Sequence, residues 1–310
     1  MKQTNFFLHI FKIMLFSGIL VATASARAEL KVVTTIKPLH SLISNVMDGI
    51  GEPGLIIDGS ISPHSFTMKP SHAKMLEEAD VIFWIGEGIE TSMEEPLDSI
   101  AKDAEVIEFM ELDSIAKLKF REESIFGDHD DHDDHAGHEG HNHGEFDAHI
   151  WLDPSNAKEM VHEIAHELGD LDPANKDKYE ANAEATIKAL DQLISDVGTD
   201  INSDAKFVVF HDAYQYFEER FGVRAAGALT LNTDVLPGAK QIADIQDVIK
   251  DKGIKCIFSE PQFNPKIITT IAEDMNIKTG VFDPLGANID PGKSLYFKLI
   301  SNLGNELKGC

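Results

Sequence analysis

The sequence predicts an α/β protein with two lobes, mainly parallel sheets and one long helix joining the lobes. Three observations predict this fold. Short apolar runs rich in β-branched residues alternate with amphipathic helical patterns. One helical pattern is longer than the rest and divides the alternation into two halves. Each half is about the size of a domain, so the chain can hold two hydrophobic cores with a cleft between them.

The predicted strands are short apolar runs that occur in both halves of the chain. In chain order they are Leu30–Ile36, Leu55–Asp58, Val81–Ile85 and Val106–Phe109, followed by Lys206–Phe210, Ile254–Ser259 and Thr279–Phe282. The long helix is predicted over Pro173–Val197, where apolar residues recur at helical spacing. Asp172-Pro173 is a start signal for this helix, and Gly198 is a stop signal.

These patterns predict four regions along the chain. They are a signal peptide at 1–28, an N-terminal lobe at 29–165 that includes a histidine-rich loop at 128–144, a linking helix region at 166–200, and a C-terminal lobe at 201–310. The long loop carries no pattern of its own, which inside a compact domain indicates function or disorder.

The N-terminus has the order of features found in a secretory signal peptide. Lys2 and Lys12 precede the apolar run Ile13–Ala22, and Ala26-Arg27-Ala28 has the small-x-small form of a cleavage site. The apolar run is too short to span a bilayer, and a buried hydrophobic helix is the alternative. We therefore expect an exported, soluble chain that begins at Glu29 and carries no lipid, since no cysteine stands directly after the predicted cut.

The charge and the cysteines agree with an exported cation-handling protein. The formal net charge is −26, and such a surface repels nucleic acid and anionic headgroups while it concentrates cations. Acidity also serves solubility, so it is supporting evidence. The two cysteines, Cys256 and Cys310, are an even count that an oxidising compartment would pair, with two free thiols as the alternative.

A histidine-rich stretch between Asp128 and Gly144 indicates divalent metal. Imidazole and carboxylate side chains at this density are metal ligands, whereas plain linkers use Gly, Ser and Lys. A solvated loop that binds metal incidentally is the alternative. The auxiliary metal ligands predicted here are His129, His132, His135, His138, His141 and His143.

Other candidate ligands stand at or after the ends of predicted strands. His211 directly follows a strand, His64 follows another after a short loop, and His149 leads back into structure. Asp283 and Glu260 directly follow two further strands. Ligands of open α/β folds bind outside the carboxyl ends of the strands. A single residue of this kind more often caps a helix or forms a hydrogen bond with the backbone. Together these residues indicate one buried metal site with ligands from both halves of the chain.

These residues lie in motifs that resemble a known family. The sequence resembles, from Leu30 to Cys310, the periplasmic zinc-binding solute-binding proteins of zinc ABC importers, the ZnuA-like members of the zinc/manganese cluster A-I family. Six motifs occur in the family's order: TTIKPLHSLI, PHSFTMKPSHAKML, HIWLDP, FHDAYQYFEERFG, FSEPQFNP and VFDPLGANI.

The resemblance implies two α/β lobes joined by a rigid helix, with one metal ion in the cleft between them. The family's metal histidines fall on His64, His149 and His211, and its carboxylate ligand falls on Asp283, a place that water or another group can take in zinc members. Its C-terminal disulfide falls on Cys256 and Cys310. The implied function is a monomeric periplasmic receptor that hands Zn²⁺ to a membrane permease driven by a separate ATPase.

The ligand types favour zinc over manganese. Manganese relatives carry Glu where this chain has His211, and three imidazoles with at most one carboxylate suit tetrahedral Zn²⁺ better. A manganese or iron receptor of the same fold remains the alternative. His40 and His72 also lie in family-like motifs, and we interpret both as structural residues on helices that point away from the cleft.

A competing motif would make the chain a secreted zinc protease. His162-Glu163-Ile164-Ala165-His166 fits H-E-x-x-H, in which two histidines one helical turn apart bind zinc and the glutamate acts as general base. The segment has the pattern of a surface helix, and no third-ligand motif of that class follows it. No P-loop, nucleophile elbow or dinucleotide motif occurs either. We therefore expect a binding protein without catalytic activity.

Overall fold

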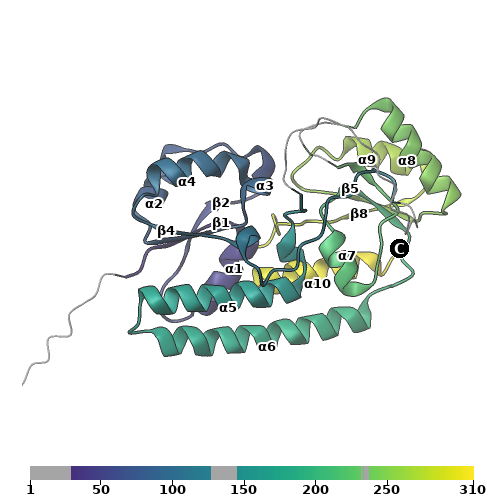
Figure 1. Ribbon diagram of the computed structural model, residues 1–310. Coiled ribbons are helices and arrows are strands. Elements are labelled where there is room, and N and C mark those ends of the chain that lie inside the picture. The colour runs from purple at the N-terminus through teal and green to yellow at the C-terminus, as the bar shows by residue number, and fades with distance from the viewer. Residues whose placement is uncertain (1–28, 127–144, 232, 234–236) are drawn as a thin grey trace, which may run out of the picture.

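The computed structural model describes residues 29–126, 145–231, 233 and 237–310. The predicted signal peptide and the histidine-rich loop lie outside the described residues. Figure 1 shows two α/β lobes next to each other, with two long helices running beneath them. Each lobe contains a four-stranded parallel sheet, in the orders β2-β1-β3-β4 and β6-β5-β7-β8. The predicted fold class is confirmed.

The first lobe alternates strands with helices. Its elements are β1 (Val32–Ile36), α1 (Lys37–Val46), β2 (Gly54–Ile57), the 3₁₀ helix η1 (Pro63–Ser65), α2 (Pro70–Glu77), β3 (Val81–Trp84), α3 (Glu87–Glu90), η2 (Thr91–Met93), α4 (Glu94–Ile100), β4 (Glu105–Glu108) and η3 (Phe109–Glu111). Every residue of β1 and β3 is buried. A parallel strand covered by helices on both faces must be apolar throughout, which explains these continuous apolar runs.

The second sheet and the helices around it complete the chain. After η4 (Ile150–Leu152) come α5 (Pro154–Leu171), α6 (Lys176–Asp200), β5 (Phe207–His211), α7 (Gln215–Phe221), β6 (Ala228–Thr230), α8 (Ala239–Asp251), β7 (Cys256–Ser259), α9 (Lys266–Met275), β8 (Lys278–Val281) and α10 (Leu295–Leu307).

The strand β6, which is three residues long, was not predicted from the sequence. The chain around Ile125 forms an antiparallel bridge with Gly227, directly before this strand. A Cβ atom on Gly227 would lie 2.6 Å from the backbone oxygen of Ser124, so glycine permits the close approach. A short Ala- and Gly-rich segment has little intrinsic strand preference, and its pairing comes from these tertiary neighbours.

The long helix α6 is present, but its predicted ends were wrong. The backbone N–H of Asp172 donates to the carbonyl of Leu168, so this residue ends α5, and Asn175 is the N-cap of α6. Gly198 does not stop the helix, which continues to Asp200. A glycine costs a helix roughly 1 kcal/mol relative to alanine, and packing of α6 against α1, α5 and α10 offsets that cost.

The final helix α10 connects the two lobes a second time. It packs against α1 and α6, and the backbone N–H of Tyr296 donates to the hydroxyl of Ser41 at 3.0 Å. Its far end leads to Cys310, which forms a disulfide with Cys256 of β7, with Cα atoms 5.6 Å apart. The predicted disulfide is confirmed. Among the described residues, no helix is both long enough and apolar enough to cross a membrane.

Candidate metal centre

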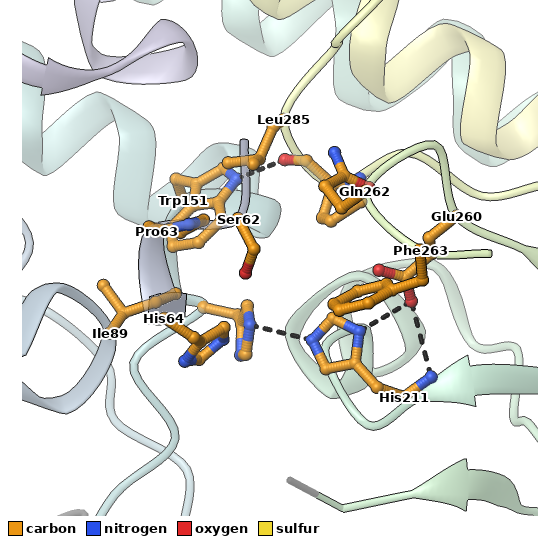
Figure 2. A pocket seen from close by; sticks show the side chains of 12 residues that line it. Ser62, Pro63, His64, Ile89, Trp151, His211, Glu260, Gln262, Phe263 and Leu285 are labelled. Atoms are coloured by element: carbon orange, nitrogen blue, oxygen red, sulfur yellow. Dashed lines mark hydrogen bonds and ion pairs between the residues drawn. The ribbon is translucent and has the colours of Figure 1, made fainter. Parts of the chain in front are cut away.

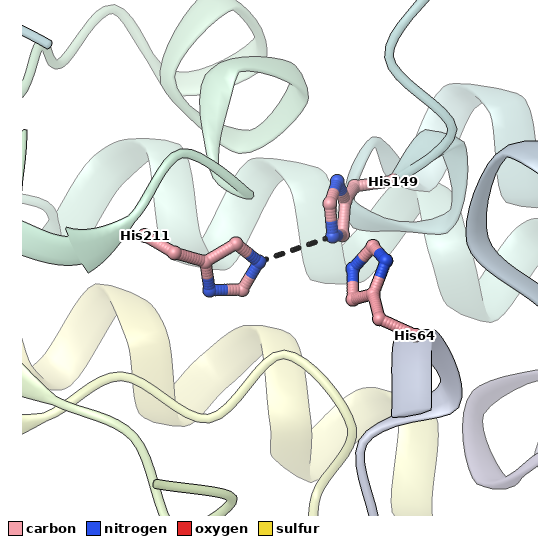
Figure 3. A group of neighbouring side chains, drawn as sticks. All are labelled: His64, His149 and His211. Atoms are coloured by element: carbon pink, nitrogen blue, oxygen red, sulfur yellow. Dashed lines mark hydrogen bonds between the residues drawn. The ribbon is translucent and has the colours of Figure 1, made fainter. Parts of the chain in front are cut away.

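Three histidines that are far apart in the sequence converge between the lobes. One candidate ligand nitrogen each from His64, His149 and His211 lies within 4.8 Å of the other two (Figure 3). The ring centre of His64 is 5.5 Å from that of His149 and 5.9 Å from that of His211. The Nε2 atoms of His149 and His211 are 3.3 Å apart. The structure therefore brings together the three histidines that the sequence singled out.

Each histidine lies in or directly beside a short structural element. His211 is the last residue of β5 and pairs with Thr230 of β6. His149 is the N-cap residue of η4, and His64 lies in η1 directly after Pro63, whose ring fixes the local backbone. The end of a strand places a side chain at the edge of the sheet without interrupting the backbone ladder, so the position of His211 is suited to a binding site.

Two buried carboxylates hold two of these rings. Oδ1 of Asp147 accepts from the His149 backbone N–H at 3.0 Å and lies 2.6 Å from its Nδ1. Oε1 of Glu260 lies 2.6 Å from Nδ1 of His211. The Asp147 and Glu260 side chains are 0% and 1% exposed. We assign the ring proton of each histidine to Nδ1, since an ionised carboxylate can only accept.

The local electrostatics favour a cation at this place. Burial lowers the pKa of His211, but the charge and hydrogen bond of Glu260, together with the charges of Asp212 and Asp147, outweigh burial and raise its pKa overall. For the acid Asp212 burial acts in the opposite direction. It raises the pKa of this carboxyl to about 7, although the charge of Arg121 lowers it. The site is thus a buried region of negative potential around three imidazoles.

Apolar side chains from both lobes enclose the histidines (Figure 2). Nε1 of Trp151 donates to the carbonyl of Pro284 at 2.7 Å, which closes one side of the cavity. The remaining lining residues are Ser62, Pro63, Ile89, Gln262, Phe263 and Leu285. A water-poor surrounding of this kind strengthens interactions between a bound cation and its ligands.

Asp283 does not belong to the group of converging ligand atoms. Its carboxylate accepts the backbone N–H groups of Leu285, Gly286 and Ala287 at 3.1, 3.0 and 2.6 Å. It also accepts from Nε2 of Gln262 at 3.1 Å. In this arrangement the carboxylate stabilises the turn that follows β8, and its role as fourth ligand stays a prediction.

The chain matches the model of the ZnuA family, described as zinc-uptake complex component A, periplasmic, over residues 32–310. It belongs to this family. The chain is 45% identical over 303 residues to the high-affinity zinc uptake system protein ZnuA of Brucella abortus (strain 2308), covering 90% of this chain and 91% of the relative. It is 33% identical over 306 residues to the ZnuA protein of Yersinia pestis, covering 96% of each.

A solved ZnuA structure has the same fold. It superposes with a TM-score of 0.73 at 24% identity, covering 89% of this chain and 98% of that chain. The two-lobe architecture with a long helix is therefore common to this ZnuA-family member and that protein.

Two histidines in motifs typical of the ZnuA family lie outside the metal centre. Nε2 of His40 is 3.2 Å from the carbonyl oxygen of Pro53, and its Nδ1 is 3.4 Å from the hydroxyl of Ser44. Nδ1 of His72 accepts the backbone N–H of Lys69 at the start of α2. These local hydrogen bonds are those expected of structural histidines.

The H-E-x-x-H segment of this ZnuA-family chain lies on α5, where His162 and His166 are both exposed. A second group of potential metal-ligating side chains in the described residues combines His166 with Glu163 and Glu167, without His162. In the part of the chain that the structure describes, neither group of three converging ligand atoms contains both histidines. The six histidines of the 128–144 loop lie outside the described residues.

Asp147 is the site residue that sequence reasoning missed. It precedes His149 by two residues in FDAHIWLDP, and a carboxylate two positions before a ligand histidine is the signal that could have revealed it. Glu260 was noticed as a strand-end carboxylate, but its contact with His211 depends on β5 and β7 being neighbours in the sheet.

Proposed function

We propose that the protein is the high-affinity periplasmic zinc receptor of an ABC importer, which binds one Zn²⁺ between His64, His149 and His211 and delivers it to a membrane permease. The observation that carries the proposal is the 3.3 Å separation between Nε2 of His149 and Nε2 of His211. Two nitrogens bound to one tetrahedral zinc, each at about 2.0–2.1 Å, are separated by about 3.3–3.4 Å.

The protonation of the rings supports the same conclusion. Because the carboxylates of Asp147 and Glu260 hold Nδ1–H of His149 and His211, Nε2 is the nitrogen that each ring turns toward the other. In the metal-free protein these two atoms are at hydrogen-bond distance and can share one proton, whose place a zinc ion takes. His64 adds a third nitrogen, and neutral imidazole is a good ligand for zinc.

Zinc is the metal that the ligand set favours. Three imidazoles form a nitrogen-rich site, whereas manganese prefers carboxylate, carbonyl and water oxygens. The names of the Brucella and Yersinia relatives also specify zinc. The fourth position is assigned to Asp283 or to water; the carboxylate of Asp283 also accepts three backbone N–H groups.

The receptor role requires no catalysis. The signal-like N-terminus and the disulfide support a soluble periplasmic protein, and the acidic composition supports one that binds no nucleic acid. In the proposed role it acts as a monomer and releases its cargo to the permease. The histidine-rich loop would hold further, weaker zinc ions and raise the local concentration of the metal.

A zinc titration tests this assignment. Calorimetry on the mature chain should show a tight phase near one equivalent and a weaker phase, and deletion of residues 128–144 should abolish the weaker phase because its histidines are removed. If the deletion abolished the tight phase, the principal site would lie in the loop and the proposed cleft site would be wrong.

Zinc affinity should fall steeply between neutral pH and about pH 5. Zinc binds neutral imidazole, whose ordinary pKa is about 6.5, so protons compete with the metal as pH falls. The pKa of His211 is raised, so this competition begins at a higher pH than it would for an unperturbed histidine. Competition titrations with a chelator of known pH dependence measure the effect. An affinity that stayed flat over this range would indicate carboxylate ligands and favour the manganese alternative.

A further inference from the structure

We infer that Asp147 and Glu260 are positioning residues, which hold His149 and His211 in the tautomer and orientation that zinc requires before the metal arrives. This inference rests on the proposed function and assigns a role to two side chains that are not themselves proposed as ligands. It predicts that the strength of zinc binding depends on hydrogen bonds to the far side of two imidazoles.

Asp147 is fixed by two residues of α7. Its Oδ2 accepts from Nε2 of Gln215 at 2.7 Å, and its carbonyl accepts the hydroxyl of Tyr216 at 2.6 Å. Both residues lie on α7, and the Gln215 amide also donates to the carbonyl of Lys119. The carboxylate therefore has one orientation, and the His149 ring that donates to it inherits that orientation.

Glu260 confines His211 in a different way. Its Oε1 receives both the ring Nδ1–H and, at 3.4 Å, the backbone N–H of His211, so the ring is fixed relative to its own backbone. The rings of Phe263 and Tyr214 lie against the same imidazole, with centres 6.0 and 6.3 Å away. The aromatic neighbours restrict the plane of the ring, and the carboxylate decides which nitrogen faces the cleft.

The two hydrogen bonds act on binding in two ways. They keep Nε2 unprotonated in the neutral rings, so zinc does not have to displace a proton from the nitrogen that it binds. They also increase the basicity of the ligand nitrogen, because a carboxylate shares the proton on the opposite side of the ring. Loss of such a partner weakens metal binding by about 10- to 100-fold in zinc sites.

A series at position 260 separates positioning from packing. In Glu260→Gln the amide oxygen can still accept from Nδ1–H, whereas Glu260→Met keeps the length of the side chain and offers no comparable acceptor. We expect zinc affinity, measured by competition with a chromophoric chelator, to fall in the order wild type, Glu260→Gln, Glu260→Met, with a loss of about 10- to 100-fold at the end of the series. Asp147→Asn should weaken binding in the same direction.

The control is Asp172→Asn. Asp172 is also a buried carboxylate, but it lies at the end of α5, where its Oδ2 accepts from Nδ2 of Asn175 at 2.6 Å. Loss of this carboxylate should leave zinc affinity nearly unchanged. Thermal melting of every variant shows that the fold is intact, and the Glu260→Gln variant keeps the test usable if Glu260→Met fails to fold.

The decisive readout is the tautomer of His211 in the metal-free protein, followed by ¹⁵N NMR of the imidazole nitrogens. The inference expects Nδ1–H in the wild type and a growing fraction of Nε2–H from Glu260→Gln to Glu260→Met. Unchanged zinc affinity in Glu260→Met would overturn it, and so would weaker binding with an unchanged tautomer, which would indicate packing. Unchanged zinc affinity in His211→Ala would instead refute the proposed zinc site. Failure of the inference and failure of the proposed site are therefore distinguishable.

Discussion

Replacing His211 with alanine should weaken tight zinc binding by orders of magnitude. The change removes one of three imidazole nitrogens, and water is a poorer zinc ligand than imidazole. It also leaves the Glu260 carboxylate buried without the ring N–H that it accepts, which adds a cost of its own. The measurement is a chelator competition in a chain that lacks residues 128–144, so that the loop histidines cannot conceal a lost site.

The matched control is the double change His162→Ala and His166→Ala. Both side chains are exposed on α5, outside the group formed by His64, His149 and His211, so tight binding should be nearly unchanged. Assays of peptide hydrolysis on the same proteins complete the comparison. The reverse pattern, with tight binding surviving without His211 and lost with the α5 pair, would reject the receptor assignment and restore the protease alternative.

Loss of the Cys256–Cys310 disulfide should destabilise the protein by about 4 kcal/mol, because the cross-link restricts the unfolded chain over a closed loop of this size. The two cysteines are separated by 54 positions in the sequence. Chemical denaturation of Cys256→Ser/Cys310→Ser, compared with the oxidised wild type, measures the change in free energy of unfolding.

Two controls accompany the disulfide experiment. The single change Cys310→Ser breaks the same bond and should destabilise the chain about as much as the double change. A reductant should lower the stability of the wild type towards that of the variants and leave the double variant unaffected. Equal stability of the oxidised wild type and the double variant would mean that the bond contributes nothing to the folded state.

Much of the fold could be predicted because parallel strands covered on both faces are continuous apolar runs. The runs at Val32–Ile36 and Val81–Trp84 have this character, and the errors there were confined to the ends. The strand Ala228–Thr230 could not be predicted, since its pairing depends on neighbours remote in sequence. The N-terminus of α6 was misplaced because Asp172-Pro173 matches a helix start signal while the backbone of Asp172 still belongs to the end of α5.

Part of the metal centre could also be predicted from the positions of residues relative to the strands. His211 ends a strand and His64 follows one after a short loop, which points to the sheet edge where ligands bind. His149 precedes a 3₁₀ helix and was singled out by its motif. The position of a carboxylate after a strand does not predict which groups its oxygens will contact. Asp283 also follows a strand, yet its oxygens accept three backbone N–H groups of the next turn. Such a turn forms from backbone geometry that the residue pattern does not reveal.

The bond between Cys256 and Cys310 also makes part of the molecule a closed covalent ring. The ring runs from β7 through α9 and β8 to α10, and α10 packs against α1 and α6, outside the second sheet. A helix that contacts the first lobe is therefore fastened at its far end to the sheet of the second. Before oxidation, the contact between α10 and its partners can fray from the C-terminus; after oxidation, fraying is limited at both ends. Formation of the disulfide thus completes a second covalent connection between α10 and the sheet of the second lobe.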